Sequence, residues 1–369
     1  MERLKYLLDI LKNGKQNICY GAGDYGQQLL GFLQTHGFDI DYFVVSENSN
    51  IEKLFGIPVV NIYDLKNSNN YNWIISVSEK YVQEIKTILK NKYINPCFIM
   101  NSNDINNIIK DALAVNKELY NIVPKNRRCF IMGTGETIKH QNLKLLQNED
   151  VFSCSFCSLL EGYNDINPQY YILPALTSDM KKTELERETY IKEKIAFYSK
   201  SVISPLIFCD YNDRNYIRYY GGFEGKKIYY LCQSKKWNEQ RKYIYNLCEK
   251  TPYIQTGSIM MLKVAMYMGY KEIYLIGTEH DLVTHKYEHA YDLERLKEYD
   301  ANKLLQIALT STKKIEQRSN REILSMSLNM YNQYFYLHNI ARQEGIQIYN
   351  ATDGGSLDEF KRIKFETLF

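Results

Sequence analysis

Residues 251–292 read TPYIQTGSIMMLKVAMYMGYKEIYLIGTEHDLVTHKYEHAYD, and this stretch predicts the centre of an α/β domain. A polar loop at 255–258 leads into an apolar helix, and Gly269 follows the helix where a left-handed cap residue is expected. The next residues, 272–276, form a short apolar segment that is typical of a buried strand.

The predicted strand runs directly into the polar sequence GTEHD at 277–281. Ligands of open parallel α/β sheets bind beyond the carboxyl ends of the strands. We therefore take Glu279, His280 and Asp281 as candidate catalytic residues. Histidine is the usual general base because its pKa lies near the working pH, and a flanking carboxylate would orient the ring.

Length and composition favour a two-domain globular protein. The 369 residues exceed what one hydrophobic core usually serves, and contents of 45% hydrophobic and 24% charged residues are ordinary. A formal net charge of +3 and the lack of a dense basic block argue against nucleic acid as a partner.

Cysteine usage and the absence of targeting signals predict a reduced, cytoplasmic protein. The 8 cysteines are scattered apart from the CxxC pair Cys154 and Cys157, which has neither a second pair nor adjacent histidines to make a zinc site. The N-terminus is amphipathic and charged, unlike a signal peptide, and no apolar run approaches the roughly 20 residues that span a bilayer. The basic and aromatic tail at 361–369 either contacts the inner face of the cell membrane or packs on its own domain.

The first domain, 1–115, alternates predicted helices and strands. We expect helices at 1–14, 27–36 and 80–91, and strands at 17–20, 39–45, 73–77 and 97–100. A GxGxxG pattern made by Gly21, Gly23 and Gly26 lies between the first strand and the next helix, which is the context of a dinucleotide-binding fingerprint. The glycines either let a pyrophosphate approach the helix or only let the helix pack on the strand, and both interpretations stay open.

The second domain, 127–369, begins again with a strand and a glycine loop. We expect strands at 128–132, 151–156, 170–173, 202–208, 228–232, 272–276 and 347–350, and helices at 138–147, 182–200, 237–250 and 323–343. The fold class is therefore two Rossmann-like α/β domains with mainly parallel sheets. The charged segment after residue 292 is either a mobile lid, an interface or a solvated helical face.

The glycine loop of the second domain reads GTGET at 133–137. Gly133 and Gly135 allow close approach of the backbone, and Thr134 and Thr137 offer hydroxyls to an anion at the start of the next helix. Thr137 is alternatively a plain helix cap.

Several of these motifs together resemble a known bacterial family. They are GTGET after a strand, TGS at 256–258 entering an apolar helix, GYKEIYLIGTEHD at 269–281, and IYNATDGG at 348–355. Residues 127–369 are similar to the MptE-like (6-hydroxymethylpterin diphosphokinase-like) proteins and the motility accessory factor glycosyltransferases, and more distantly to bacterial CMP-sialic-acid-dependent sialyltransferases. Residues 15–100 resemble the N-terminal domain found on bacterial sugar O-acyltransferases.

The resemblance implies a Rossmann-like glycosyltransferase core that needs no metal or other cofactor. It implies an inverting transfer from a nucleotide-sugar donor, with CMP as one donor class, to a glycan acceptor of lipopolysaccharide or capsule. The substrate-binding residues it implies, besides those of the glycine loop, are Ser155, Gln255, Thr256, Gly257, Ser258, Gly277, Tyr287 and His289.

This sequence departs from the sialyltransferase pattern at three motifs. Thr134 stands where the family has a nucleotide-contacting Asn, Ser155 lies in a motif that reads C-N-Q in the family, and 173–176 read LPAL in place of NPSL. The amides that read cytidine are absent from all three motifs, so the donor nucleotide stays open.

Three alternatives remain at this stage. His280 is either the base or a hydrogen-bonded histidine at a strand end, and one histidine among His280, His285 and His289 could join Glu279 and Asp281 at a metal. An MptE-like pyrophosphokinase would need ATP and Mg²⁺, yet the chain has no P-loop motif. A non-catalytic nucleotide-sugar-binding protein is the third reading, and a homo-oligomer stays open.

Overall fold

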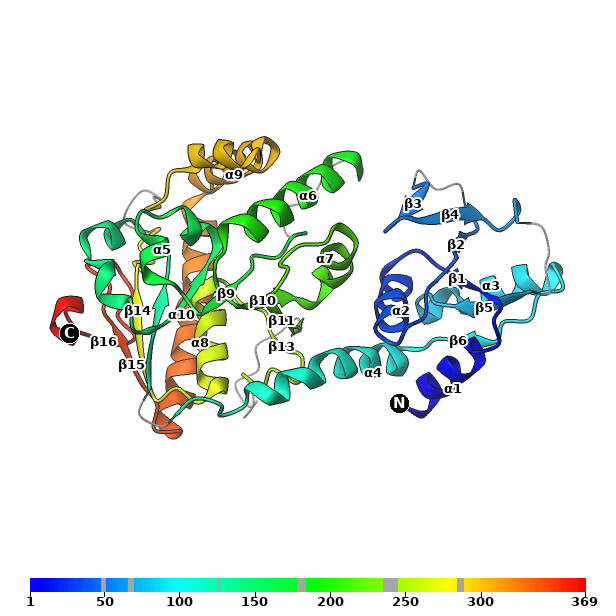
Figure 1. Cartoon of the computed structure of the whole chain (residues 1–369), viewed down its shortest axis with the longest axis horizontal. Helices are drawn as coiled ribbons and strands as arrows, with labels where there is room; N and C mark the ends of the chain where they lie inside the picture. The colour runs from blue at the N-terminus through cyan, green and yellow to red at the C-terminus, as the bar shows by residue number, and fades with distance from the viewer. Residues whose placement is uncertain (48–50, 66–69, 125–126, 178–183, 235–244, 284–288) are drawn as a thin grey trace. The chain divides into compact units, whose positions relative to one another are not determined.

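The computed structural model describes residues 1–47, 51–65, 70–124, 127–177, 184–234, 245–283 and 289–369. The chain divides into two compact units (Figure 1). The first unit comprises Met1–Ala114 and Arg214–Tyr219, and the second comprises Val115–Asp213 and Tyr220–Phe369. Each unit is an α/β fold around a mainly parallel sheet, which confirms the predicted fold class.

The sheet of the first unit has the strand order β3-β4-β2-β1-β5-β6. Every pairing is parallel except that of β3 with β4. The chain starts at the central strand, moves outward to one side and then crosses to the other, as in a Rossmann-like domain. The strands are β1 Gln16–Tyr20, β2 Tyr42–Val45, β3 Lys53–Leu54, β4 Ile57–Asn61, β5 Tyr71–Ile75 and β6 Phe98–Ile99.

Helices bury apolar side chains on both faces of this sheet. Helices α1 Glu2–Leu11, α2 Asp24–Thr35 and α4 Ser102–Leu113 share one core cluster, and α3 Glu79–Asn91 packs in the other. The amphipathic spacing of Leu4, Leu7 and Leu11 puts these residues on one buried face of α1, as the periodicity predicts.

The sheet of the second unit has eight parallel strands in the order β11-β10-β9-β8-β7-β14-β15-β16. The chain runs from β7 outward to β11 and then returns to place β14 on the other side of β7. The strands are β7 Arg128–Met132, β8 Asp150–Cys154, β9 Tyr170–Ile172, β10 Leu206–Asp210, β11 Lys227–Leu231, β14 Glu272–Ile276, β15 Gln347–Asn350 and β16 Lys361–Arg362. A small separate pair is formed by β12 Gln233–Ser234 and β13 Thr251–Pro252.

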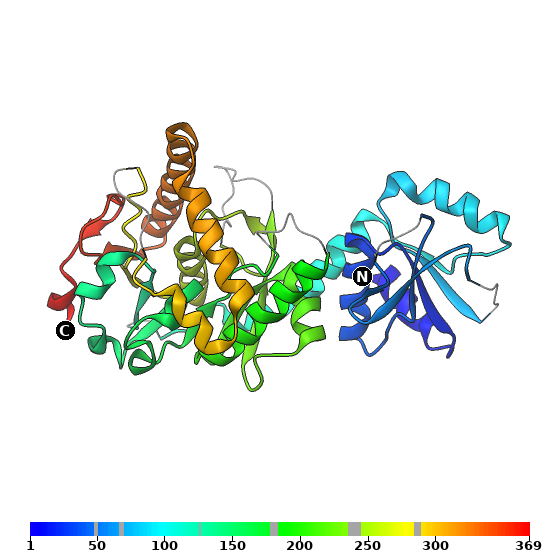
Figure 2. The ribbon, with the colours of Figure 1, turned by 90° about the horizontal axis from the view of Figure 1, so that it is seen from above.

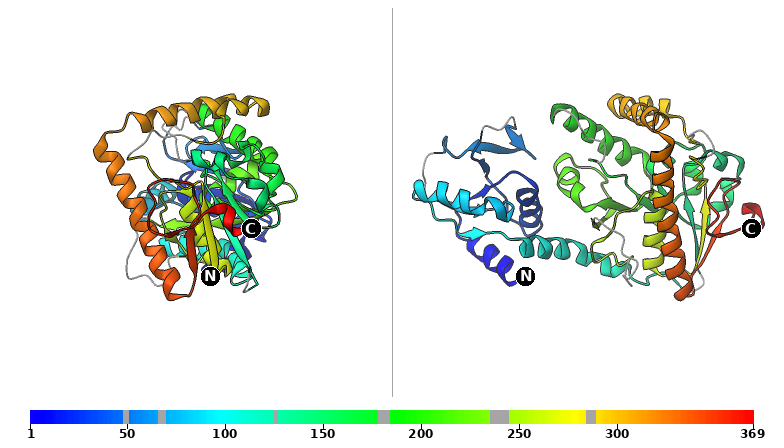
Figure 3. Two further views of the ribbon diagram at one scale, coloured as in Figure 1. Left: turned by 90° about the vertical axis from the view of Figure 1, so that its left-hand side faces the viewer. Right: turned by 180° about the vertical axis from the view of Figure 1, so that it is seen from behind.

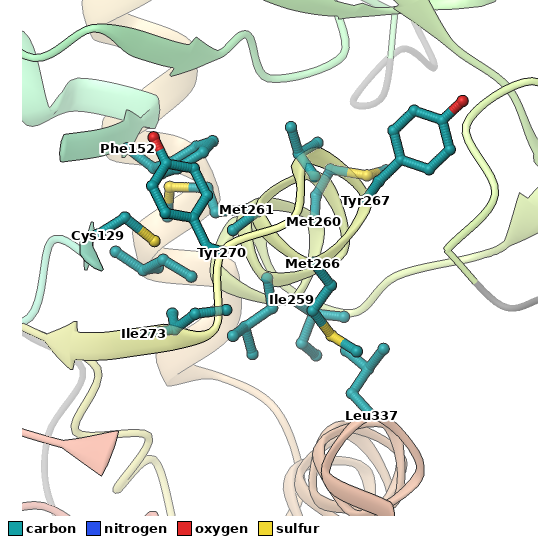
Figure 4. Close-up of a cluster of buried hydrophobic side chains, with 14 of the residues drawn as sticks. Cys129, Phe152, Ile259, Met260, Met261, Met266, Tyr267, Tyr270, Ile273 and Leu337 are labelled. Atoms are coloured by element: carbon teal, nitrogen blue, oxygen red, sulfur yellow. The ribbon is translucent and has the colours of Figure 1, made fainter. Parts of the chain in front are cut away.

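Helix α8, Gly257–Met268, is the core element of the second unit. All its residues from Ser258 to Met268 are buried, which explains why all of them except Ser258, Lys263 and Tyr267 have apolar side chains. Figure 4 shows Cys129, Phe152 and Ile273 on one side of α8 and Leu337 on another. Gly269 ends the helix with a φ of 99°, the left-handed cap that the sequence predicts.

Helix α10, Asn320–Gln343, runs along α8 (Figure 3) and packs against both α8 and β15. A capping box formed by Ser319 and Glu322 begins it. Helix α9, Asn302–Glu316, packs against α6, Glu184–Ser201 (Figure 2). The other helices are α5 Tyr163–Ile166 and α7 Arg214–Tyr220, with the 3₁₀ turns η1 Ala114–Leu119, η2 Glu136–His140, η3 Leu143–Leu146, η4 Ser155–Leu159, η5 Tyr211–Asp213, η6 Leu293–Tyr299 and η7 Phe365–Leu368.

The C-terminal tail packs on the second unit. Phe365 is buried, and the ring of Phe369 stacks on Phe130 with centroids 5.7 Å apart. The carbonyl of Leu368 accepts a hydrogen bond of 3.0 Å from the Arg128 guanidinium. Of the two interpretations of the tail, the structure shows packing on its own domain.

Several predicted elements differ from the structure. The expected helix 138–147 is wrong: η2 and η3 occupy this stretch, because the backbone at Gln141 is extended, with φ −99° and ψ 139°, and its side chain donates to the carbonyl of Ala351. The strand expected at 202–208 is displaced to β10, since α6 continues to Ser201. The loop after β10 contains α7, and most of the expected helix 237–250 lies outside the described residues.

Candidate active site

The candidate site lies at the carboxyl ends of β7 and β14, which are neighbours in the sheet although their connections leave in opposite directions. This is the switch point at which doubly wound sheets bind ligands. The two strand ends are joined by the N–H of Gly133, which donates to Ile276 at 2.8 Å, and by the N–H of Gly135, which donates to Gly277 at 2.9 Å.

The glycines here serve contact within the protein. A β-carbon added to Gly133 would lie 2.2 Å from the carbonyl oxygen of Gly277. A β-carbon added to Gly135 would lie 1.3 Å from an oxygen of the Glu279 carboxylate. Both positions therefore need glycine so that the loops after β7 and β14 can meet.

Glu279 is buried and binds the start of η2. Its Oε1 accepts a hydrogen bond of 2.9 Å from the N–H of Thr137 and another from the Thr137 hydroxyl. In this structure the Thr137 hydroxyl donates to a carboxylate of the protein, and its predicted contact with a bound anion stays a prediction. Thr137 is also not the cap residue, since the N-cap of η2 is Gly135.

His280 follows Glu279 but contacts a different set of side chains. Its Nε2 lies 2.7 Å from the hydroxyl of Tyr334 and 3.4 Å from that of Ser258. The Tyr331 hydroxyl donates to the backbone carbonyl of His280 at 3.0 Å, and this contact holds a residue whose φ is 53°. The described partners of Nε2 are thus hydroxyls, and Glu279 does not orient this ring.

Burial controls the protonation of His280. It lowers the pKa of the imidazole to about 4, because a charged ring loses more solvation than a neutral one. The ring is therefore neutral at neutral pH, and its lone pair is less basic than that of an ordinary histidine, contrary to the expectation of a pKa near the working pH. The adjacent Asp281 is partly exposed.

The loop before α8 adds the hydroxyl of Thr256 to this network through Ser258. Thr256 Oγ1 lies 2.9 Å from Ser258 Oγ, which lies 2.7 Å from the Tyr334 hydroxyl. The backbone N–H of Gln255 donates to Oε1 of Gln333 at 2.9 Å. Gly257 fits against β8, where a β-carbon would lie 2.8 Å from Sγ of Cys154.

His289 contacts the glycine loop of the second unit. Its Nδ1 lies 3.1 Å from Thr134 Oγ1, and the N–H of Ala290 donates to the carbonyl of Thr134 at 3.0 Å. Burial lowers the pKa of His289, and its ring stacks on Tyr291 with centroids 4.6 Å apart. Thr134 is thus paired with His289, while Tyr287 and His285 lie outside the described residues.

Ser155 begins the loop after β8 with a φ of 53°, and its carbonyl accepts a hydrogen bond from Tyr171. The nearby Cys154 and Cys157 are free and buried. In the part of the chain that the structure describes, no three His, Cys, Asp or Glu side chains converge to hold a metal ion. Glu279, which the metal alternative requires, binds Thr137 instead.

Sequence reasoning missed the contribution of α10. Gln333 and Tyr334 are buried, and with Tyr331 they bind the Gln255–Ser258 loop and His280. A buried tyrosine needs a partner for its hydroxyl, which is the one signal the sequence carried. Nothing in a single sequence pairs Tyr334 with a histidine 54 positions away.

The glycine loop of the first unit can be described by itself. A β-carbon on Gly21 would lie 2.5 Å from the carbonyl of Ser76, and one on Gly26 would lie 1.9 Å from the carbonyl of Gly21, so both glycines serve packing. Gly23 would meet nothing within 4 Å. Packing therefore explains two of the three glycines, and the predicted nucleotide at this loop stays a prediction.

No family model matches this sequence, and no curated protein matches it. Among solved structures, the chain is similar to the sialyltransferase CstII from Campylobacter jejuni in complex with the substrate analogue CMP-3FNeuAc. The identity is 18% and the TM-score 0.40, over 64% of this chain and 86% of that chain. A structure of the sialyltransferase CST-II with a trisaccharide acceptor and CMP gives 17% identity and a TM-score of 0.37 over the same shares. TM-scores this low do not establish a shared family.

None of the helices in the described ranges is both long and apolar enough to cross a lipid bilayer.

Proposed function

We propose that the second unit is a glycosyltransferase that moves a sugar from a nucleotide-activated donor to an acceptor of a bacterial surface glycan. The observation that carries the proposal is the position of a neutral His280, hydrogen-bonded to hydroxyl groups, beyond the carboxyl end of β14 at the switch point of the sheet. The sequence resemblance of residues 127–369 supports the same class of reaction.

The arrangement fits the needs of sugar transfer. An inverting transfer needs a group that takes the proton of the acceptor hydroxyl while the nucleotide leaves with its bonding electrons. His280 is neutral and can accept that proton, and Thr256 and Gln255 offer hydrogen-bonding groups to a polar substrate at the partly exposed side of the loop.

An aromatic group beside the glycine loop fits a flat ring of the donor. Tyr291 lies between His289 and Phe156, with centroid distances of 4.6 Å and 5.3 Å, and all three side chains are partly exposed. Stacking does not select one base, so the donor could carry cytidine, uridine or guanosine. The cytidine-reading amides are absent from this chain, so CMP is one donor among several to be tested.

No described feature favours the pyrophosphokinase alternative. Its phosphates would need the N–H groups of a glycine loop, and in the second unit the N–H of Thr137 already binds Glu279. A non-catalytic nucleotide-sugar-binding protein would use the same loops but would not need a neutral histidine.

A ligand screen followed by a transfer assay tests the proposal. Thermal shift with CMP-, UDP-, GDP- and CDP-linked sugars identifies the donor, because a ligand that binds the native state stabilises it. With that donor and a glycan acceptor, mass spectrometry should detect the transferred sugar, and His280→Gln should lower kcat by about 10²–10⁴-fold.

Three outcomes would contradict the proposal. An unchanged rate in His280→Gln removes His280 from the reaction. Binding without transfer for every donor favours the binding protein, and a product that forms only with ATP favours the pyrophosphokinase. Tyr274→Phe is the control, because Tyr274 lies on the same strand as the site but donates its hydroxyl hydrogen to Glu272 at the opposite end.

A further inference from the structure

Three hydroxyl groups form a continuous hydrogen-bonded chain that ends at His280. The steps are 2.9 Å from Thr256 Oγ1 to Ser258 Oγ, 2.7 Å from Ser258 Oγ to the Tyr334 hydroxyl, and 2.7 Å from that hydroxyl to His280 Nε2. All three distances are within the normal range for hydrogen bonds. The chain joins the loop before α8, the helix α10 and the end of β14.

The middle of this chain is buried, and its two ends, Thr256 and His280, are partly exposed. Ser258 is 5% exposed and Tyr334 is fully buried, so neither hydroxyl can exchange protons directly with solvent or substrate. Thr256 is partly exposed at the N-cap of α8, and its side chain makes no cap hydrogen bond there. A polar molecule that contacts the chain from the loop side therefore meets Thr256 before the two buried hydroxyls.

Each hydroxyl in this chain can donate or accept, and a neutral imidazole nitrogen does one or the other according to its tautomer. Proton transfer toward His280 requires one order of donors. In that order, Tyr334 donates to Nε2 of His280 and accepts from Ser258, and Ser258 accepts from Thr256. In this order Thr256 presents a free lone pair outward, and His280 carries its proton on Nδ1.

We propose that Thr256, Ser258 and Tyr334 form a proton relay that carries the proton of the sugar acceptor to Nε2 of His280. This proposal rests on the proposed function and goes beyond it, because it makes Thr256, and not the imidazole, the group that contacts the acceptor hydroxyl. Tyr334 is then a relay residue on α10 that touches no substrate.

The proton and electron balance of the step is complete. The acceptor oxygen bonds to the anomeric carbon of the donor, and the bond from that carbon to the nucleotide phosphate breaks with its electron pair on the phosphate. The acceptor proton passes to Thr256 as Thr256, Ser258 and Tyr334 each pass their own proton inward, and His280 becomes an imidazolium. The negative charge on the released nucleotide stabilises that cation, and the proton returns to solvent along the same chain after the products leave.

Alanine would cut the chain but also leave a cavity, so the variants are chosen to remove only hydroxyls. Tyr334→Phe keeps the ring that packs at 5.7 Å on Phe360. Thr256→Val removes the outer hydroxyl, and Thr256→Ser retains it as the rescue variant. Tyr274→Phe is the matched control for the loss of a buried tyrosine hydroxyl outside the relay.

The first measurement is imidazole ¹⁵N NMR of the full-length protein, which needs no substrate. With six histidines, the His280 signals are assigned from their loss in His280→Gln. We expect protonated Nδ1 and bare, hydrogen-bonded Nε2 at neutral pH, and a shift of the Nε2 signal in Tyr334→Phe but not in Tyr274→Phe. A proton on Nε2 would overturn the relay.

The second measurement is transfer kinetics with the donor found by the ligand screen. We expect Tyr334→Phe and Thr256→Val to lower kcat by about 10²-fold with KM changed less than threefold, and Thr256→Ser to restore most of the rate. The solvent isotope effect should depend on deuterium fraction along a curve, because several protons move together, and should become linear in Tyr334→Phe.

These outcomes distinguish a failure of the proton relay from a failure of the proposed glycosyltransferase function. Transfer that proceeds at the normal rate in Tyr334→Phe, or that shows a linear isotope dependence in the parent protein, overturns the relay and leaves the glycosyltransferase standing. No transfer with any donor overturns the proposed function and the relay with it, whatever the nitrogen signals show.

Discussion

Gly135→Ala should destabilise the second unit strongly although the backbone at this position is ordinary. Gly135 has φ −65° and ψ 154°, which any residue can adopt, so the cost must come from sterics alone. The new methyl would lie 1.3 Å from one oxygen of the Glu279 carboxylate and 2.2 Å from its carboxyl carbon. The carboxylate must therefore leave its place.

The magnitude follows from the contacts that Glu279 would lose. Its carboxylate accepts the N–H and the hydroxyl of Thr137. Hydrogen bonds to a charged group contribute about 1.5–3 kcal/mol each, so the loss of both should be about 3–6 kcal/mol. For a domain of 150–250 residues this corresponds to a fall in Tm of roughly 6–24 °C.

A double-mutant cycle in a urea titration, followed by circular dichroism, isolates this effect. Glu279→Ala removes the group that the new methyl would strike, so Gly135→Ala should cost little more in that background. Gly23→Ala is the control, because Gly23 is also the extended N-cap of a helix and its β-carbon would meet nothing within 4 Å. We expect that variant to stay within about 0.5 kcal/mol of the parent. A coupling free energy near zero between Gly135 and Glu279 would refute the reasoning.

Three further predictions concern protonation and capping. The pKa of His280 falls from an unfolded value near 6.5 to about 4, so the unfolded chain binds more protons than the folded chain between these pH values. The free energy of unfolding should therefore decrease by at most about 3 kcal/mol as the pH falls through this range. A urea series from pH 7 to 4 should show a smaller loss in His280→Gln. Burial lowers the pKa of Lys263 to about 7, so the fold should lose stability as the pH falls from about 10.5 to 7. Lys263→Met should therefore unfold at a higher urea concentration than the parent at pH 7. A lower urea midpoint for the variant would show that the amine stabilises the core. Ser319→Ala breaks the capping box with Glu322 and should destabilise the start of α10 by about 1 kcal/mol. Amide hydrogen exchange in the first turn of α10 should then be faster than in the parent. Unchanged exchange would show that the cap is not needed.

The sequence predicted the architecture where local patterns decide it. Apolar strands followed by glycine loops located β1, β7 and β14, and the αL cap at Gly269 marked the end of α8. The helix expected at 138–147 failed because its conformation depends on partners that are distant in sequence. Thr137 binds Glu279, and Gln141 donates to Ala351.

The candidate site also combines features that local patterns predict with contacts between residues distant in sequence. The sequence identified the loops that carry Thr134, Thr256 and His280, because strand ends and polar turns are local signals. It paired Glu279 with His280 as neighbours in sequence, whereas the structure directs Glu279 toward Thr137 and His280 toward Tyr334. Both residues lie beyond β14, and the left-handed backbone of His280, with a φ of 53°, turns the chain there, so adjacency alone could not tell which partners they meet.

The central place of β7 has a consequence for synthesis on the ribosome. One edge of β7 pairs with β8, and its other edge pairs with β14, where Arg128 is opposite Glu272. The strands β8 to β11 are synthesised before β14. At typical translation rates, the free edge of a buried strand therefore waits on the order of ten seconds for its neighbour. During that interval the nascent chain presents an unpaired apolar ribbon, so this half of the molecule should depend on chaperones that shield the edge until β14 has emerged.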